Sequence, residues 1–295
     1  MRRNYTIAAF LMLVFVGITG CQKNPVVTEP KAPEGAINAV FSVSPEKKVY
    51  FSKGNLQYRA TTDVWRFAEH QYDTIGKANL NKSPDYDGWI DLFAWGTSGY
   101  DHGAVCYQPW SMDENEANYW AYGDSHCNLY DKSGLADWGC NAISNGGNCE
   151  NFGWRTLTVD EWTFLIHRPT PSGIRWAWVK VFGVVGMALL PDQWDTSTYS
   201  FPLNDPNGLH VSVIPDEDWT NVLEPAGVVF LPQAGYTGYI GYGSTFGNRG
   251  QYWSSSVDGH YDLVYSVYMF SPDFYFGDLI EKNKGCSVRL VYPAE

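Results

Sequence analysis

The stretch from Gly76 to Gly153 constrains the fold of this chain most, because it has neither a helical nor a strand period. A long irregular stretch inside a compact domain is usually functional or disordered. Tryptophans recur along it, and they favour order because they bury large apolar areas. These are Trp89, Trp95, Trp110, Trp120 and Trp138. We therefore expect long ordered loops held by aromatic side chains.

Short β-rich segments lie on both sides of this stretch, bounded by glycine, proline and polar residues. Such runs are typical of antiparallel strands and hairpins. We predict strands at 39–43, 48–52, 55–58, 174–181, 186–190, 228–231, 252–255, 264–270 and 287–291. The fourth and fifth of these are expected to form a hairpin that turns near Gly183.

The clearest helix begins at Thr158. Thr158 and Glu161 have the spacing of a capping box, in which the two side chains satisfy amides at the helix start. An apolar face begins at Trp162, and Pro169 ends the helix. Residues 216–223 are a second, shorter candidate. Few helices, many short strands and long ordered loops predict an α+β fold with short antiparallel sheets.

The N-terminus has the pattern of an export signal. An uncharged apolar run follows Arg2 and Arg3, and it is too short for the roughly 20 residues of a membrane-spanning helix. It ends Ile18-Thr-Gly-Cys21, which resembles the lipobox of bacterial lipoproteins, so Cys21 is the expected lipidation site. Ordinary secretion, with a cysteine there by chance, is the alternative.

Domain organisation follows from this signal. Residues 1–20 are the expected signal peptide, and residues 21–37 the lipidated cysteine with a proline-rich tether. Residues 38–295 contain no second linker and no sustained repeat, so one domain is expected. Attachment to the membrane would be through the lipid alone, since acyl chains anchor a protein stably.

The acidic composition excludes several partners. The chain has 20 Lys and Arg against 32 Asp and Glu, a formal charge of −12. Nucleic acid and anionic lipid surfaces are bound through positive patches, so neither is an expected partner.

Five cysteines follow Cys21, in an exported context that permits disulfides. Cys140 and Cys149 enclose a short Gly/Asn loop, so we predict a bond between them. The pairing of Cys106, Cys127 and Cys286 stays open.

A zinc site would need Cys106, Cys127, Cys140 and Cys149 with His102 or His126, but the spacings match no zinc pattern. We expect no metal and no cofactor. Calcium binding by the clustered oxygens of Asp85–Asp91 stays open, and the alternative is that this segment is a solvated turn.

The segment from Ser256 to Phe276 is the strongest candidate for a binding face. It mixes tyrosine and aspartate as antibody binding loops do, giving rigid amphipathic area with polar contacts. The candidate ligand-binding residues are Asp258, His260, Tyr261, Tyr265, Tyr268 and Phe274. Strand alternation would place Tyr261 and Tyr265 on the opposite face of the strand from Val264 and Tyr268, so part of this set is expected in the core. The alternative is a strand that only alternates core and surface residues.

Six sequence blocks resemble a family of lipoproteins from Gram-negative gut bacteria. They are 49–57, 141–148, 154–162, 227–236, 252–256 and 285–291. The last four are also similar to the major paralogous domain (FISUMP type), which is related to the C-type-lectin-like fold of formylglycine-generating enzymes. The resemblance covers about residues 38–292. It implies a C-type-lectin-like fold, terminal strands that lie close together, and long loops that carry any binding site.

The resemblance also bears on individual residues. Trp154, Trp162 and Trp253 would be core residues, and Arg155 and Arg289 buried hydrogen-bond anchors. Formylglycine-generating enzymes use paired cysteines near the C-terminus, whereas the C-terminal half here has only Cys286. The calcium-binding sugar motif of C-type lectins is replaced by Glu224-Pro-Ala and Trp219-Thr-Asn.

Together these features predict an outer-membrane lipoprotein, and not an enzyme, that binds a glycan or a protein ligand at the cell envelope. The first alternative is a structural or assembly component of a cell-surface complex, and the second is a glycan hydrolase. Acidic residues converging in a deep pocket would favour the hydrolase. The identity of the ligand, the oligomeric state, and display at the surface or the periplasmic face stay open.

Overall fold

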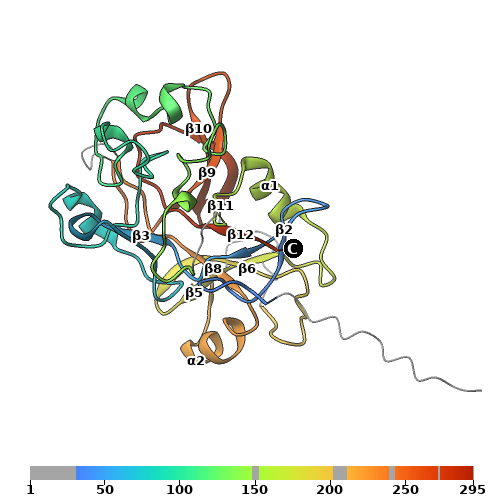
Figure 1. The fold of residues 1–295 in the computed structure, drawn as a ribbon. Helices are drawn as coiled ribbons and strands as arrows, with labels where there is room; N and C mark the ends of the chain where they lie inside the picture. Colours follow the sequence, from blue (N-terminus) through green and yellow to red (C-terminus); the bar gives the residue numbers. More distant parts are fainter. Residues whose placement is uncertain (1–30, 148–152, 202–210, 239–242, 272, 295) are drawn as a thin grey trace, which may run out of the picture. The chain divides into compact units, whose positions relative to one another are not determined.

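Strands from the two ends of the folded unit form one sheet (Figure 1). β2 (Lys48–Phe51) pairs antiparallel with β12 (Val291–Ala294) on one side and with β1 (Phe41–Ser42) on the other. This confirms the expectation that the terminal strands are neighbours. The amide of Ile37 donates to Phe51 O at 2.8 Å, so the last residues of the expected tether already belong to the folded unit.

The computed structural model describes residues 31–294 apart from 148–152, 202–210, 239–242 and 272. Residues 31–295 form one unit, separate from residues 1–30. The predicted signal peptide and Cys21 therefore lie outside the described residues. Among the residues that are described, no helix is both long and apolar enough to cross a membrane.

A second antiparallel sheet carries the segment that the sequence singled out. Its order is β11 (Asp273–Ile280), β10 (Val264–Phe270), β9 (Gly250–Val257), with β10 in the centre. β11 was not predicted. Its register against β10 shifts at Gly277, which has φ +93° and interrupts the alternation that would have marked a strand.

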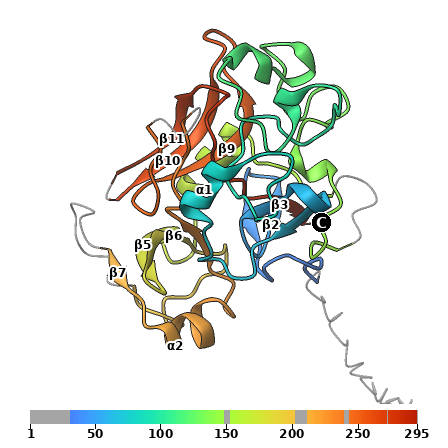
Figure 2. The same cartoon turned by 90° about the vertical axis from the view of Figure 1, so that its left-hand side faces the viewer.

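A third sheet has the order β7 (Ser212–Val213), β5 (Trp176–Val181), β6 (Val184–Leu189), β8 (Val229–Pro232). β5 and β6 form the predicted hairpin. Its two-residue turn, Phe182 and Gly183, has positive φ at both positions, as a tight turn between twisted strands requires. Figure 2 shows β5 and β6 between α2 and the sheet of β9, β10 and β11, and side chains of β5 and β6 share a core cluster with those of β9 and β10.

The middle of the chain forms ordered loops around a small hairpin, β3 (Leu56–Arg59) with β4 (Val64–Phe67). Trp95 and Trp138 are fully buried, as expected of aromatic side chains that hold loops in place. Short 3-10 helices replace longer elements in this region. They are Ala60–Thr62, Gly76–Asn81, Val105–Tyr107, Glu116–Tyr119, Ala121–Gly123 and Trp138–Cys140.

Both predicted helices are present. α1 (Val159–His167) begins with the predicted capping box, since Thr158 Oγ1 accepts from the amide of Glu161 and Glu161 Oε2 accepts from the amide of Thr158. α2 (Asp216–Asp218) continues directly into a π-helical turn, Trp219–Leu223.

Aromatic side chains dominate the core, and Trp154, Trp162 and Trp253 are all buried as predicted. Arg289 is also buried, donating to Gln71 and Asn55.

The prediction of a strand at 287–291 is wrong for all but its last residue. Cys286 and Ser287 form only isolated bridges, and the regular strand starts at Val291. The fold is α+β with short, mainly antiparallel sheets and few helices.

Candidate functional site

A cavity of about 660 Å³ opens beside the start of α1. Four separate parts of the chain form its walls: the turn between β1 and β2, the loop 130–137, the segment 155–161 that leads into and begins α1, and the end of β12. The lining residues are Glu46, Lys47, Lys48, Tyr130, Asp137, Arg155, Thr156, Thr158, Glu161, Pro293 and Ala294. Concave sites with a few converging polar groups are where ligands usually bind.

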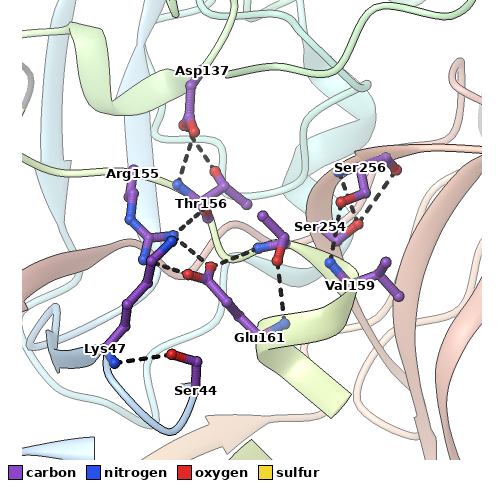
Figure 3. A network of polar contacts seen from close by, with 10 residues as sticks. Ser44, Lys47, Asp137, Arg155, Thr156, Val159, Glu161, Ser254 and Ser256 are labelled. Carbon is purple, nitrogen blue, oxygen red and sulfur yellow. Dashed lines mark hydrogen bonds and ion pairs between the residues drawn. The ribbon is translucent and has the colours of Figure 1, made fainter. Parts of the chain in front are cut away.

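An ion pair between Arg155 and Glu161 forms the inner wall (Figure 3). Arg155 Nη1 lies 2.6 Å from Glu161 Oε2, and Nη2 lies 2.8 Å from Oε1. The backbone of Arg155 pairs with Val291 of β12, which fixes the arginine against the terminal sheet. Because Glu161 also belongs to the capping box, this wall is rigid and both carboxylate oxygens are occupied.

Asp137 supports the same wall from behind. Its Oδ2 accepts from the amide of Thr156 at 2.9 Å, and its Oδ1 accepts from the hydroxyl of Thr156 at 2.8 Å. Burial raises the pKa of Asp137 above its ordinary value, and the hydrogen bonds from Thr156 offset part of this rise. Both oxygens already accept protein donors, so this carboxyl has a structural role.

The rim of the cavity is less constrained than its wall. Lys47, Lys48 and Glu46 are exposed, and within the described residues neither lysine side chain has a hydrogen-bond or ion-pair partner. Figure 3 shows Lys47 beneath the Arg155–Glu161 pair. Tyr130 is 51% exposed and adds an aromatic face. The rim therefore offers cationic donors and an aromatic ring to a solute.

The predicted ligand-binding residues do not form one surface. Asp258 is buried and organises the turn between β9 and β10: its Oδ2 accepts from the amides of His260 and Tyr261, and its Oδ1 accepts from the Tyr265 hydroxyl. Burial works against ionisation, but these hydrogen bonds bring the pKa of Asp258 below its ordinary value. His260 is exposed beside Tyr261, which is 72% exposed at the turn, whereas Tyr265 is half-buried.

Tyr268 and Phe274 lie on opposite faces of the same sheet. Phe274 packs 4.6 Å from the Trp176 ring, at the edge of a core cluster, so its role is packing. Tyr268 faces outward, with its ring 5.8 Å from that of Tyr275. Arg249 lies against the same tyrosine, its Cζ 4.4 Å from the ring centroid.

The outward face thus contains residues that the sequence analysis missed. Tyr275 is 59% exposed, and Phe270 shares this side because side chains alternate along β10. Arg249 also contacts Tyr236 at 4.3 Å, so its guanidinium lies between two tyrosine rings. Arginine, tyrosine and phenylalanine scattered over 40 residues give no local signal. Only the pairing of β9, β10 and β11 brings them together.

The structure describes only part of the predicted disulfide and the candidate metal sites. Cys149 lies outside the described residues, so its bond to Cys140 stays a prediction. The Cys140 thiol lies 3.2 Å from Leu135 O. Within the described residues no three potential metal ligands come together. Asp87 and Asp91 have separate protein partners: Asp87 accepts from Thr61, and Asp91 accepts from Asn79 and the amide of Ile75.

Comparison with known proteins gives no match: no family model fits the sequence, and no curated protein or solved structure matches the chain. The resemblance to gut-bacterial lipoproteins and to the C-type-lectin-like fold therefore stays a prediction from sequence motifs.

Proposed function

We propose that this chain is a lipid-anchored protein of the outer membrane that binds a glycan in the cavity beside α1. The observation that carries the proposal is the contrast between the wall and the rim of that cavity. In the wall, Arg155 donates hydrogen bonds to both carboxylate oxygens of Glu161. The rim instead presents the unpaired side chains of Lys47 and Lys48 and the half-exposed ring of Tyr130.

These groups suit a sugar. Ammonium groups donate hydrogen bonds to hydroxyl or carboxylate oxygens, and an aromatic face packs against the apolar face of a sugar ring. A preformed wall lowers the ordering that binding would otherwise require. The anchor is supported by the sequence alone, through the basic start, the short apolar run and Cys21.

A hydrolase is supported less well by the same cavity. General acid catalysis needs a carboxyl oxygen within reach of the substrate. The oxygens of Asp137 and Glu161 instead accept hydrogen bonds from Thr156, Thr158 and Arg155. The arrangement favours recognition over acid–base chemistry.

A glycan array probed with the soluble mature polypeptide, residues 22–295, tests this proposal. We expect binding to a limited set of related glycans, and loss of that binding when Tyr130→Ala and Lys47→Ala are combined. Binding to no glycan, or equal binding by the double variant, would reject the cavity as a glycan site.

A second candidate function, recognition of a protein in a cell-surface complex, is favoured by the outward face of β9–β11. That face presents tyrosine, phenylalanine and arginine, which are residue types enriched in protein interfaces; they are Tyr268, Phe270, Tyr275 and Arg249. Cross-linking in intact cells tests it. Tyr275→Ala should remove a cross-linked partner while leaving glycan binding unchanged.

A further inference from the structure

A second cationic site lies on the β3–β4 hairpin, formed by two arginines and one tryptophan. Arg66 pairs with Gln57 across the hairpin, and Arg59 is two residues beyond Gln57 on the same strand. Cross-strand partners share a face, as do residues two apart, so both arginines project from one side of the hairpin.

Trp89 covers this side. The backbone pairing of Tyr58 with Ile90 holds the tryptophan next to the hairpin. Arg66 Cζ lies 3.8 Å from the centroid of the Trp89 ring, and Arg59 Cζ lies 4.6 Å from it. The indole thus fixes two guanidinium groups close to each other.

The two guanidiniums have few acceptors. Arg66 Nε donates to Gln57 Oε1 at 2.9 Å, while Arg59 Nε is buried with no partner. Within the described residues the terminal nitrogens of both arginines have no hydrogen bond, and neither arginine is ion-paired. Arg59, Arg66 and Trp89 are all partly exposed, so a solute can reach them.

Two like charges held together without a directly paired carboxylate are costly. Burial, followed by the charge of Arg59, lowers the pKa of Arg66, whereas Glu69 and Asp73 act in the opposite direction. An anion between the arginines would relieve the repulsion and satisfy the free donors. Planar guanidiniums match the oxygens of such anions in pairs.

We propose that Arg59 and Arg66, held by Trp89, bind an oxyanion group of a ligand: a carboxylate, a sulfate or a phosphate. The site is separate from the cavity beside α1 and does not depend on the function proposed for that cavity.

Calorimetric titration of residues 22–295 with acetate, sulfate and phosphate, at ionic strength fixed with chloride, tests the proposal. Fixed ionic strength separates site binding from general screening. At least one oxyanion should bind saturably. Arg59→Gln and Arg66→Gln should each weaken it about tenfold, because each removes charge-assisted hydrogen bonds. Lys180→Gln, which removes one charge on β5, is the matched control and should bind as the wild type does.

A labelling experiment on the unaltered protein covers the case in which a variant fails to fold. Phenylglyoxal modifies accessible arginines, and peptide mapping locates the adducts. The bound oxyanion should protect Arg59 and Arg66 but not Arg175, whereas chloride should protect none. The absence of saturable binding by all three anions, wild-type affinity in both glutamine variants, or equal labelling with and without the oxyanion would overturn the site.

Discussion

Arg155 and Glu161 are joined by two parallel hydrogen bonds, of 2.6 and 2.8 Å, although one precedes α1 and the other lies within its first turn. The same glutamate accepts the amide of Thr158 and so closes the capping box. One carboxylate therefore fixes the start of the helix and the wall of the cavity.

Replacing Glu161 should test this double role. Glu161→Ala removes the capping contact and leaves Arg155 without its partner, so we expect the free energy of unfolding to fall by about 2 kcal/mol. Asp160→Ala, in the same turn but exposed, should cost about 0.5 kcal/mol or less. Urea denaturation measures both, and equal losses would contradict the role assigned to Glu161.

The buried carboxyl of Asp91 predicts a dependence of stability on pH. Burial raises its pKa to about 6, despite hydrogen bonds from Asn79 and Ile75, whereas an unfolded chain has a value of about 3.9. Between these values the native state binds the proton more tightly, so this group's contribution to stability falls as the pH rises.

Comparison with Asp91→Asn isolates that contribution. The unfolding free energy of the wild type minus that of the variant should decrease from about pH 4 to about pH 6 and stay level above about pH 7. Urea denaturation at each pH gives this difference. A difference that rises across the same interval would show that Asp91 titrates in the opposite sense.

The lipid anchor is a prediction about residues outside the described part of the chain. Cys21→Ala should abolish acylation and release the protein from membranes, because it removes the residue expected to carry the acyl chains. Metabolic labelling with a fatty acid and membrane fractionation provide the readout. Label that persists on the alanine variant would place the lipid elsewhere.

The bond predicted between Cys140 and Cys149 is tested by peptide mapping. Burial raises the pKa of the Cys140 thiol to about 12, so a free thiol there would alkylate slowly in the folded protein. Free thiols must therefore be blocked in denaturant before reduction. We expect a linked peptide containing both cysteines. Two alkylated thiols would show that the bond is absent.

The sequence predicted elements whose determinants are local. The capping box of α1 and the turn at Gly183 depend on residues within one helical turn or one hairpin, and both are present. The sequence analysis missed β11 and placed the strand β12 too early, at 287–291. Gly277 disrupts the alternation of β11, and β12 is defined by its pairing with β2 far away in the sequence.

The candidate site was harder to predict than the fold. The cavity joins Lys47, Tyr130, Arg155 and Pro293, and no spacing in the sequence connects these positions. The tyrosines of the C-terminal segment gave a visible pattern, but pattern alone could not show that Phe274 packs at the edge of the core while Tyr268 faces outward. Side-chain identity indicated binding chemistry, and tertiary contacts determined where it lies.

The affinity of residues 22–295 for a glycan identified on the array tests the proposed glycan site most directly. Tyr130→Ala and Lys47→Ala should each weaken binding by about tenfold, since each removes a contact at the rim of the cavity. Tyr261→Ala, which removes a more exposed aromatic ring at the β9–β10 turn, should leave the affinity unchanged. Loss of binding in Tyr261→Ala, with wild-type affinity in both cavity variants, would contradict the account.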